Sequence, residues 1–287
     1  MSLILSIAVD GVAYGMILFM ISVGLSITMG LMRIINLAHG GFALFGGAAV
    51  HILTTRFDVP FIAALLGAVL AVVLIAVLLE RLFYRHIYGF NELGQVLATI
   101  GIVFIMIATV NLFLGSTILS LGAPAIFATP IDLGFRTLPF HRLIVIICGL
   151  SVLAGLWLLM EKTRLGIYLR AAVDNKTAAA SLGINTPLVY LGAFALGAGL
   201  AAVGGILGAE LLPIEAYYPL RYMVLFLIVV SVGGLGSIPG SFWASIGLGI
   251  LDTAGRYLLP GIGTIFFFMA IAVLLALRPN GLMGKAQ

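Results

Sequence analysis

The stretch FIAALLGAVLAVVLIAVLL, residues Phe61–Leu79, decides the fold of this chain. It carries no charged side chain, and its apolar residues do not alternate with polar ones as in the strands of a membrane barrel. A helix rises about 1.5 Å per residue, so about 20 apolar residues cross a hydrocarbon core about 30 Å thick. The stretch therefore predicts a helix that spans a lipid bilayer.

Similar apolar runs occur along the whole chain, at Val96–Leu114, Leu143–Met160 and Ile262–Leu277. The 287 residues are 63% hydrophobic and 8% charged, with a mean hydropathy of +1.27. A soluble domain carries about 25% charged residues, so water cannot be the main solvent of this chain. We predict an all-α polytopic membrane protein that forms one transmembrane domain over residues 1–287.

The apolar pattern places the embedded helices at about residues 9–31, 41–54, 60–80, 93–114, 141–161, 188–211, 222–236, 241–258 and 262–277. The second and the seventh are short and adjoin glycine-rich breaks, which is typical of half-spanning or re-entrant segments. We therefore predict eight or nine transmembrane or half-spanning helices.

The basic residues predict the orientation. Nine of the 14 Lys and Arg residues lie on one side, at Arg33, Arg81–Arg85, Lys162–Lys176 and Arg278–Lys285. The remaining five are Arg56, Arg136, Arg142, Arg221 and Arg256. Because cytoplasmic loops carry an excess of Lys and Arg, we expect the first set in the cytoplasm. The N-terminus is then outside and the C-terminus inside.

Two loops are long. Residues 115–140 form an expected periplasmic loop, which is either a simple crossover or part of a docking surface for an external partner. Residues 161–187 form the cytoplasmic stretch. Its Ala-rich part predicts a short helix, with Asp174 or Asn175 as N-cap, Gly183 as the left-handed residue at the C-terminus, and Pro187 in the first turn of the next span.

Small side chains on such a helix let another protein approach closely. The 161–187 stretch is therefore interpreted as a coupling segment that fits a cytoplasmic ATPase, with an amphipathic connector on lipid headgroups as the alternative. The motifs Arg164-Leu-Gly166, Arg170-Ala-Ala and Ala179-Ala-Ser-Leu-Gly-Ile-Asn185 resemble the cytoplasmic loop of branched-chain amino acid ABC permeases. Asp174 lies upstream of the alanines, where the related loop of importer permeases has a glutamate directly before them.

The resemblance extends over the whole chain. Similar motifs are Gly24–Gly40, Gly233–Gly240 and Leu277–Gly284, and the length resembles the shorter, LivH-type subunit of that family. The resemblance implies the ATPase-coupling residues Arg164, Gly166, Arg170, Asp174, Asn175, Ala179, Ala180, Gly183, Ile184 and Asn185.

It also implies the partners. They are a longer homologous permease in a heterodimer, two cytoplasmic ATP-binding subunits, a periplasmic solute-binding protein and the lipid of the bacterial inner membrane. ATP is then used by the partner subunits, and this chain binds no cofactor. Branched-chain amino acids are the first expected solutes. Permeases of the same family for urea, amides or aromatic acids are the alternative.

Two breaks interrupt the apolar helices. The first contains Asn36, His39, Gly40 and Gly41, and the second contains Gly233, Gly234, Gly236 and Ser237. Interrupted segments at matching positions often line the pathway of a transporter. The alternatives are a structural turn at the first break and close helix packing at the second. We assign Gly11 with Gly15, and Gly204 with Gly208, to helix packing.

Charges inside the apolar runs are few. Asp252 and Arg256 are spaced for an ion pair on one helix, which is favoured over a proton relay. Glu210 and Glu215 are expected at the external end of a span.

No Gly-x-x-x-x-Gly-Lys-Ser/Thr motif is present, so we expect no ATP site in the chain. The four histidines are scattered and predict no metal site. We therefore expect neither an enzyme nor a nucleic-acid-binding protein. An ion-coupled secondary transporter and a passive channel for a small solute remain rival interpretations.

Overall fold

The computed structural model describes residues 2–32, 34–121, 125–132, 137–279 and 281–283. Among these residues, each predicted span corresponds to one long helix, so the all-α membrane fold is confirmed. The long helices are α1 (Ser2–Met32), α2 (His39–Arg56), α3 (Phe61–Leu79), α5 (Glu92–Leu114), α6 (Phe140–Lys162), α9 (Thr186–Gly208), α10 (Tyr218–Gly233), α11 (Ile238–Leu258) and α12 (Gly263–Leu277).

Length and composition allow five of the described helical segments to cross a bilayer unaided. They are Leu3–Gly30, Phe61–Ile87, Glu92–Leu114, Phe140–Lys162 and Thr186–Gly208. The segment Phe61–Ile87 is continuous because the π-helical turn η1 (Glu80–Tyr84) and α4 (Arg85–Ile87) extend α3. Of the two spans predicted to be short, α10 has 16 residues, whereas α2 has 18 and is longer than predicted. Helix α12, with 15 residues, is shorter than either.

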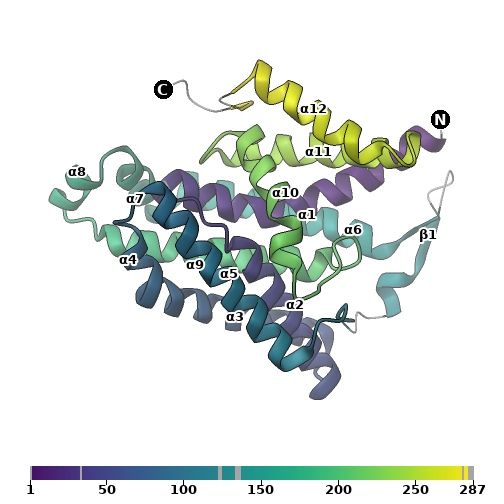
Figure 1. The fold of residues 1–287 in the computed structure, drawn as a ribbon, viewed down its shortest axis with the longest axis horizontal. Coiled ribbons are helices and arrows are strands. Elements are labelled where there is room, and N and C mark those ends of the chain that lie inside the picture. The colour runs from purple at the N-terminus through teal and green to yellow at the C-terminus, as the bar shows by residue number, and fades with distance from the viewer. Residues whose placement is uncertain (1, 33, 122–124, 133–136, 280, 284–287) are drawn as a thin grey trace.

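The remaining smaller elements lie in the two long loops. The loop of residues 115–140 holds the 3-10 helix η2 (Ala125–Ala128) and the antiparallel strands β1 (Pro130–Asp132) and β2 (Thr137–Pro139). The 161–187 stretch holds α7 (Arg164–Asp174) and α8 (Lys176–Ser181). Figure 1 shows α4, α7 and α8 at one end of the bundle, and the N-terminus and β1 at the opposite end.

Helix α1 lies at the centre of the bundle and packs against α6, α9, α10 and α11. Glycines permit its close contacts. A Cβ on Gly24 would lie 2.7 Å from the Cα of Gly197 in α9, and one on Gly11 would lie 2.6 Å from the Cα of Ile250 in α11. Gly204 and Gly208 contact α1 at Ile21 and Ile17. The predicted packing role of both glycine pairs is therefore confirmed.

Apolar side chains also cover much of the outer surface. Large exposed hydrophobic residues follow α3, α5, α6 and α12, as expected of helices whose solvent is lipid. The predicted orientation and the predicted terminal motif include five residues that lie outside the described residues, namely Arg33, Arg136, Asn280, Gly284 and Lys285.

Candidate functional site

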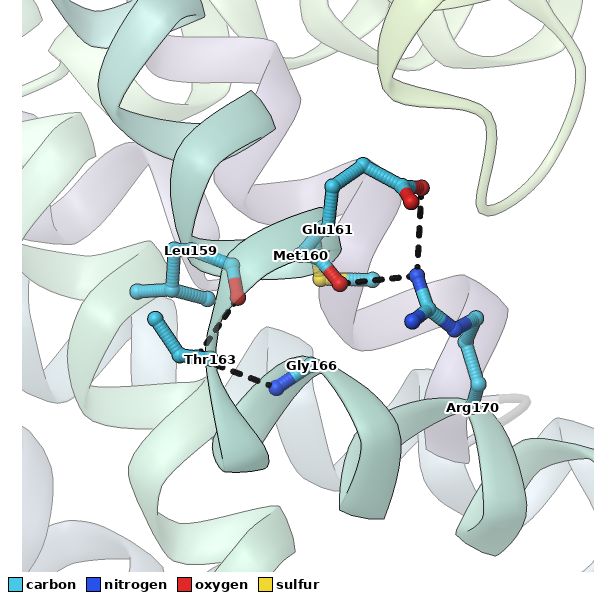
Figure 2. A network of polar contacts seen from close by, with 6 residues as sticks. All are labelled: Leu159, Met160, Glu161, Thr163, Gly166 and Arg170. Atoms are coloured by element: carbon cyan, nitrogen blue, oxygen red, sulfur yellow. Dashed lines mark hydrogen bonds and ion pairs between the residues drawn. The ribbon is translucent and has the colours of Figure 1, made fainter.

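The 161–187 stretch begins with a tight turn between α6 and α7. The Thr163 hydroxyl donates to the Leu159 carbonyl at 2.6 Å and accepts from the Gly166 amide at 3.4 Å (Figure 2). One threonine therefore closes the last turn of α6 and caps the first turn of α7. Sequence reasoning missed this helix, because its mixed composition gave no simple apolar run.

Two further contacts fasten α7 to the end of α6. A Cβ on Gly166 would lie 2.2 Å from the Met160 carbonyl oxygen, so this position has no room for a side chain. The Arg170 guanidinium donates to that carbonyl at 2.7 Å and to the Glu161 carboxylate at 3.2 Å (Figure 2). A cation thus satisfies a carbonyl that the helix end leaves unpaired.

The inner face of α7 joins three long helices. Leu169 and Ala172 lie in one buried cluster with Phe19 of α1, Leu156 of α6 and Val189 of α9. Other side chains of α7 are exposed, among them the apolar Leu165, Ile167, Tyr168 and Val173. Helix α7 is therefore in direct contact with the central helix α1.

Helix α8 is short and capped at both ends. Asn175, rather than Asp174, is its N-cap, and its Oδ1 accepts from the Ala178 amide at 2.9 Å. Gly183 has a φ of +84°, and the amides of Gly183 and Ile184 donate to the carbonyls of Ala180 and Ala179. This is a Schellman cap, so the predicted role of Gly183 is confirmed.

The next helix follows at once. The Asn185 side chain accepts from the Leu188 amide at 3.2 Å and caps α9, with Pro187 in the first turn as predicted. The short helix predicted for the Ala-rich part is α8. The unpredicted α7 is separated from it by Asn175, whose backbone is extended with φ −154° and ψ 101°.

The surface of α8 is small and polar except at its end. Ala179 is buried, whereas its neighbour Ala180 is exposed, as are Arg164 and Asp174 at the two ends of α7. Leu182 is 81% exposed and follows the last turn of α8. Sequence reasoning missed Leu182, although an isolated leucine before a capping glycine was a visible signal.

The first break is buried inside the bundle. Asn36 Oδ1 accepts from the Ala38 amide at 3.1 Å and from the Tyr84 hydroxyl at 2.8 Å, which makes an Asx turn before α2. His39 Nε2 lies 3.0 Å from the carbonyl oxygen of Ile21, in the middle of α1. Asn36 and His39 are each only 2% exposed. Helix α2 therefore begins well inside the bundle.

The two glycines of this break contact other helices. A Cβ on Gly40 would meet Pro219 and Phe226 of α10, and one on Gly41 would meet Met106 of α5. Close by, the buried Glu80 of η1 accepts from the Tyr88 hydroxyl at 2.9 Å. Burial raises the pKa of Tyr88 well above its ordinary value, and Glu80 raises it further, so Tyr88 remains a donor at neutral pH.

The second break lies against the end of α1. Gly234 and Gly236 have φ values of +95° and +78°, and Ser237 caps α11 by accepting from the Gly240 amide at 3.0 Å. A Cβ on Gly30 would lie 2.3 Å from the Cα of Gly236. The second break thus touches the last turns of α1, which lead into the first break.

A protein-family model described as branched-chain amino acid transport system / permease component matches residues 7–277. The chain belongs to this permease family. It is 26% identical to the high-affinity permease protein LivH of Salmonella typhimurium, over 97% of this chain and 94% of that protein. It is 24% identical to BraD of Pseudomonas aeruginosa, over 97% of this chain and 95% of BraD.

A third relative, the probable LivH of Methanocaldococcus jannaschii, is 27% identical over 95% of this chain and 90% of its own length. Among solved structures, PsaBC from Streptococcus pneumoniae in complex with Fab covers 93% of this permease and 89% of its own chain. Its TM-score is 0.49 and its sequence identity is 11%.

At the end of the bundle opposite α7 and α8, the permease carries several ion pairs. The predicted pair of Asp252 and Arg256 is confirmed at 2.8 Å. Asp10 of α1 pairs with Arg142 of α6 and accepts from the Tyr257 hydroxyl at 2.8 Å. Sequence reasoning missed Asp10, whose signal was a lone carboxylate within an apolar run.

The two glutamates at the same end also have partners. Glu210 lies 3.1 Å from His141, and Glu215 lies 2.6 Å from Arg221. Within the described part of the permease, no group of three or more His, Cys, Asp or Glu side chains is placed to hold a metal ion.

Proposed function

We propose that this permease is a membrane-spanning subunit of a binding-protein-dependent ABC importer in the bacterial inner membrane. In this proposal it forms half of the translocation pathway for branched-chain amino acids or similar small polar solutes. The observation that carries the proposal is the attachment of the exposed α8 and Leu182, through α7, to the central helix α1. The names of LivH and BraD support the solute class.

In this proposal, different partners act at the two ends of the molecule. Two cytoplasmic subunits bind and hydrolyse ATP, and one of them receives α8. A second, homologous permease completes the pathway as a heterodimer, and a periplasmic binding protein delivers the solute at the external end. This chain holds no nucleotide of its own. Closure of the ATPases displaces α8, and α7 passes the motion to α1, α6 and α9.

The experiment is solute uptake in proteoliposomes that contain both permeases, the ATPases and the binding protein. We expect leucine uptake to require ATP and the binding protein, and to stop with vanadate. Replacing Leu182 by aspartate should release the ATPases from the complex or uncouple hydrolysis from uptake. Ile118→Ala, at an exposed position of the external loop, is the matched control and should retain its ATPases.

Different outcomes identify the rivals. Uptake that ignores ATP and collapses with an uncoupler would indicate an ion-coupled secondary transporter, and the buried carboxylates Asp10 and Asp252 would then be the residues to study. Uptake of urea, amides or aromatic acids in preference to leucine would leave the importer mechanism intact and change only the solute.

A further inference from the structure

Three tyrosines converge between the outer halves of α1, α10 and α11. Tyr14 is 6% exposed and Tyr218 is fully buried, and the rings of Tyr218 and Tyr222 lie 4.8 Å apart between centroids. Tyr14 belongs to the same buried cluster as Tyr218 and Tyr222. Among the residues that the structure describes, neither the Tyr14 nor the Tyr218 hydroxyl has a hydrogen-bond partner.

Two buried hydroxyls without partners require an explanation. A polar group that leaves water without forming a hydrogen bond is destabilising, and phenylalanine would provide the same apolar ring without that cost. Buried polar atoms that lack a protein partner commonly bind a ligand or an ordered water. The charged groups beside these hydroxyls indicate whether a ligand or a water is bound there.

Two opposite charges adjoin the tyrosines. Asp252 and Arg256 form an ion pair at 2.8 Å, and the Arg256 guanidinium carbon lies 5.8 Å from the centroid of the Tyr14 ring. The Asp252 side chain is 9% exposed, whereas that of Arg256 is 64% exposed. The cluster therefore has a buried acceptor and an accessible cation that can be approached from the external end.

A second cation lies at the same end. The Arg221 guanidinium carbon is 5.5 Å from the centroid of the Tyr222 ring, and Arg221 is held by Glu215. Arg256 and Arg221 thus flank the tyrosines, and each carries its own carboxylate. Because each arginine is paired with a carboxylate, the region has little net positive charge to attract a free anion. It does present both a positive and a negative group, to which the two charges of a zwitterion can bind.

We propose that Tyr14, Tyr218, Tyr222, Asp252 and Arg256 form a site for the head group of a zwitterionic α-amino acid. The solute carboxylate accepts hydrogen bonds from the two tyrosine hydroxyls and from Arg256, and the solute ammonium donates to Asp252. The tyrosine rings contact the aliphatic side chain. The inference rests on the proposed import function, because the site receives the solute from the external side.

The test removes one hydroxyl at a time. Tyr14→Phe and Tyr218→Phe are placed in the complete complex in proteoliposomes, and leucine uptake and ATP hydrolysis are measured on the same vesicles. Loss of one hydrogen bond to a charged group corresponds to about a tenfold effect. We expect leucine imported per ATP to fall about tenfold, with unchanged stimulation of hydrolysis by the leucine-loaded binding protein. Tyr217→Phe, at the exposed neighbouring position, should behave as wild type.

Direct binding makes the inference independent of transport. The complex without its binding protein is incubated with labelled leucine. Leucinol, which lacks the carboxylate, and 4-methylpentanoate, which lacks the ammonium, are added as competitors. We expect each to compete at least tenfold more weakly than leucine. Equal competition, or wild-type binding and uptake with greater thermal stability in both variants, would show that the hydroxyls hold only water. ATP-independent uptake by the wild type would refute the proposed importer, while the binding comparison would still decide the site.

Discussion

Arg170 connects two helices through one side chain. Its bond to the Met160 carbonyl at 2.7 Å completes the end of α6, while its backbone belongs to α7. An exposed ion pair such as Arg170–Glu161 contributes about 0–1 kcal/mol, so the importance of Arg170 lies in position rather than in stability.

Replacing Arg170 by alanine should therefore separate the two effects. We expect the free energy of unfolding to fall by less than about 1 kcal/mol, while the solute moved per ATP decreases because α7 is less firmly held. Glu161→Gln keeps the Met160 contact and is the control. Equal coupling in Arg170→Ala and wild type, measured as uptake and hydrolysis in one preparation, would contradict this role.

Gly166 gives a steric prediction. In Gly166→Ala the new methyl group would overlap the Met160 carbonyl, so α7 must move away from α6. We expect destabilisation by about 1–3 kcal/mol, as for other overpacked sites. Thermal unfolding in detergent measures it, and Gly155→Ala on α6, where an added Cβ meets no atom within 4 Å, is the matched control.

At the scale of the element, the stability of α8 depends more on its two capping residues than on the helix propensity of its own residues. The helix has six residues, fewer than an isolated helix needs, and is held between the Asn175 N-cap and the Gly183 C-cap. Its exposed face is thereby kept in one orientation relative to α7.

Loss of the N-cap should loosen α8 selectively. Asn175→Ala removes the acceptor of the Ala178 amide, which corresponds to about 1 kcal/mol. We expect faster hydrogen exchange in residues 176–181 and weaker retention of the ATPases. Asn175→Asp preserves a capping oxygen and should resemble the wild type, and identical exchange in all three proteins would argue against this dependence.

The elements also show what could be predicted from sequence. The caps at Asn175 and Gly183 and the Asp252–Arg256 pair depend on residues within a few positions of one another, and they were predicted together with the spans. The Asp10–Arg142 pair and the Asn36–Tyr84 bond join distant parts of the chain, and no periodicity indicates them. The same limit applies to the tyrosine cluster, whose members become neighbours only through packing.

For the whole molecule, the decisive property is which end faces the cytoplasm. The chain has one cysteine, Cys148, so a Cys148→Ala background is free of thiols. In that background we expect Leu182→Cys to react with a membrane-impermeant maleimide only after the cells are permeabilised, and Ile118→Cys to react in intact cells. Both variants should react in detergent, which confirms that the thiols are accessible. The reverse pattern would overturn the orientation.

The central position of α1 has a consequence for biogenesis. Helix α1 ends at Met32, yet its partners α9 and α11 begin at Thr186 and Ile238. At a synthesis rate of about 5–20 residues per second, α1 waits on the order of ten seconds before α9 has been translated. During that interval the glycine-lined faces of α1 contact lipid or the insertion machinery instead of α9 and α11. Asp10 likewise can form its ion pair only after Arg142 has been synthesised. The nascent chain therefore needs a holding environment in the membrane until the second half has been made.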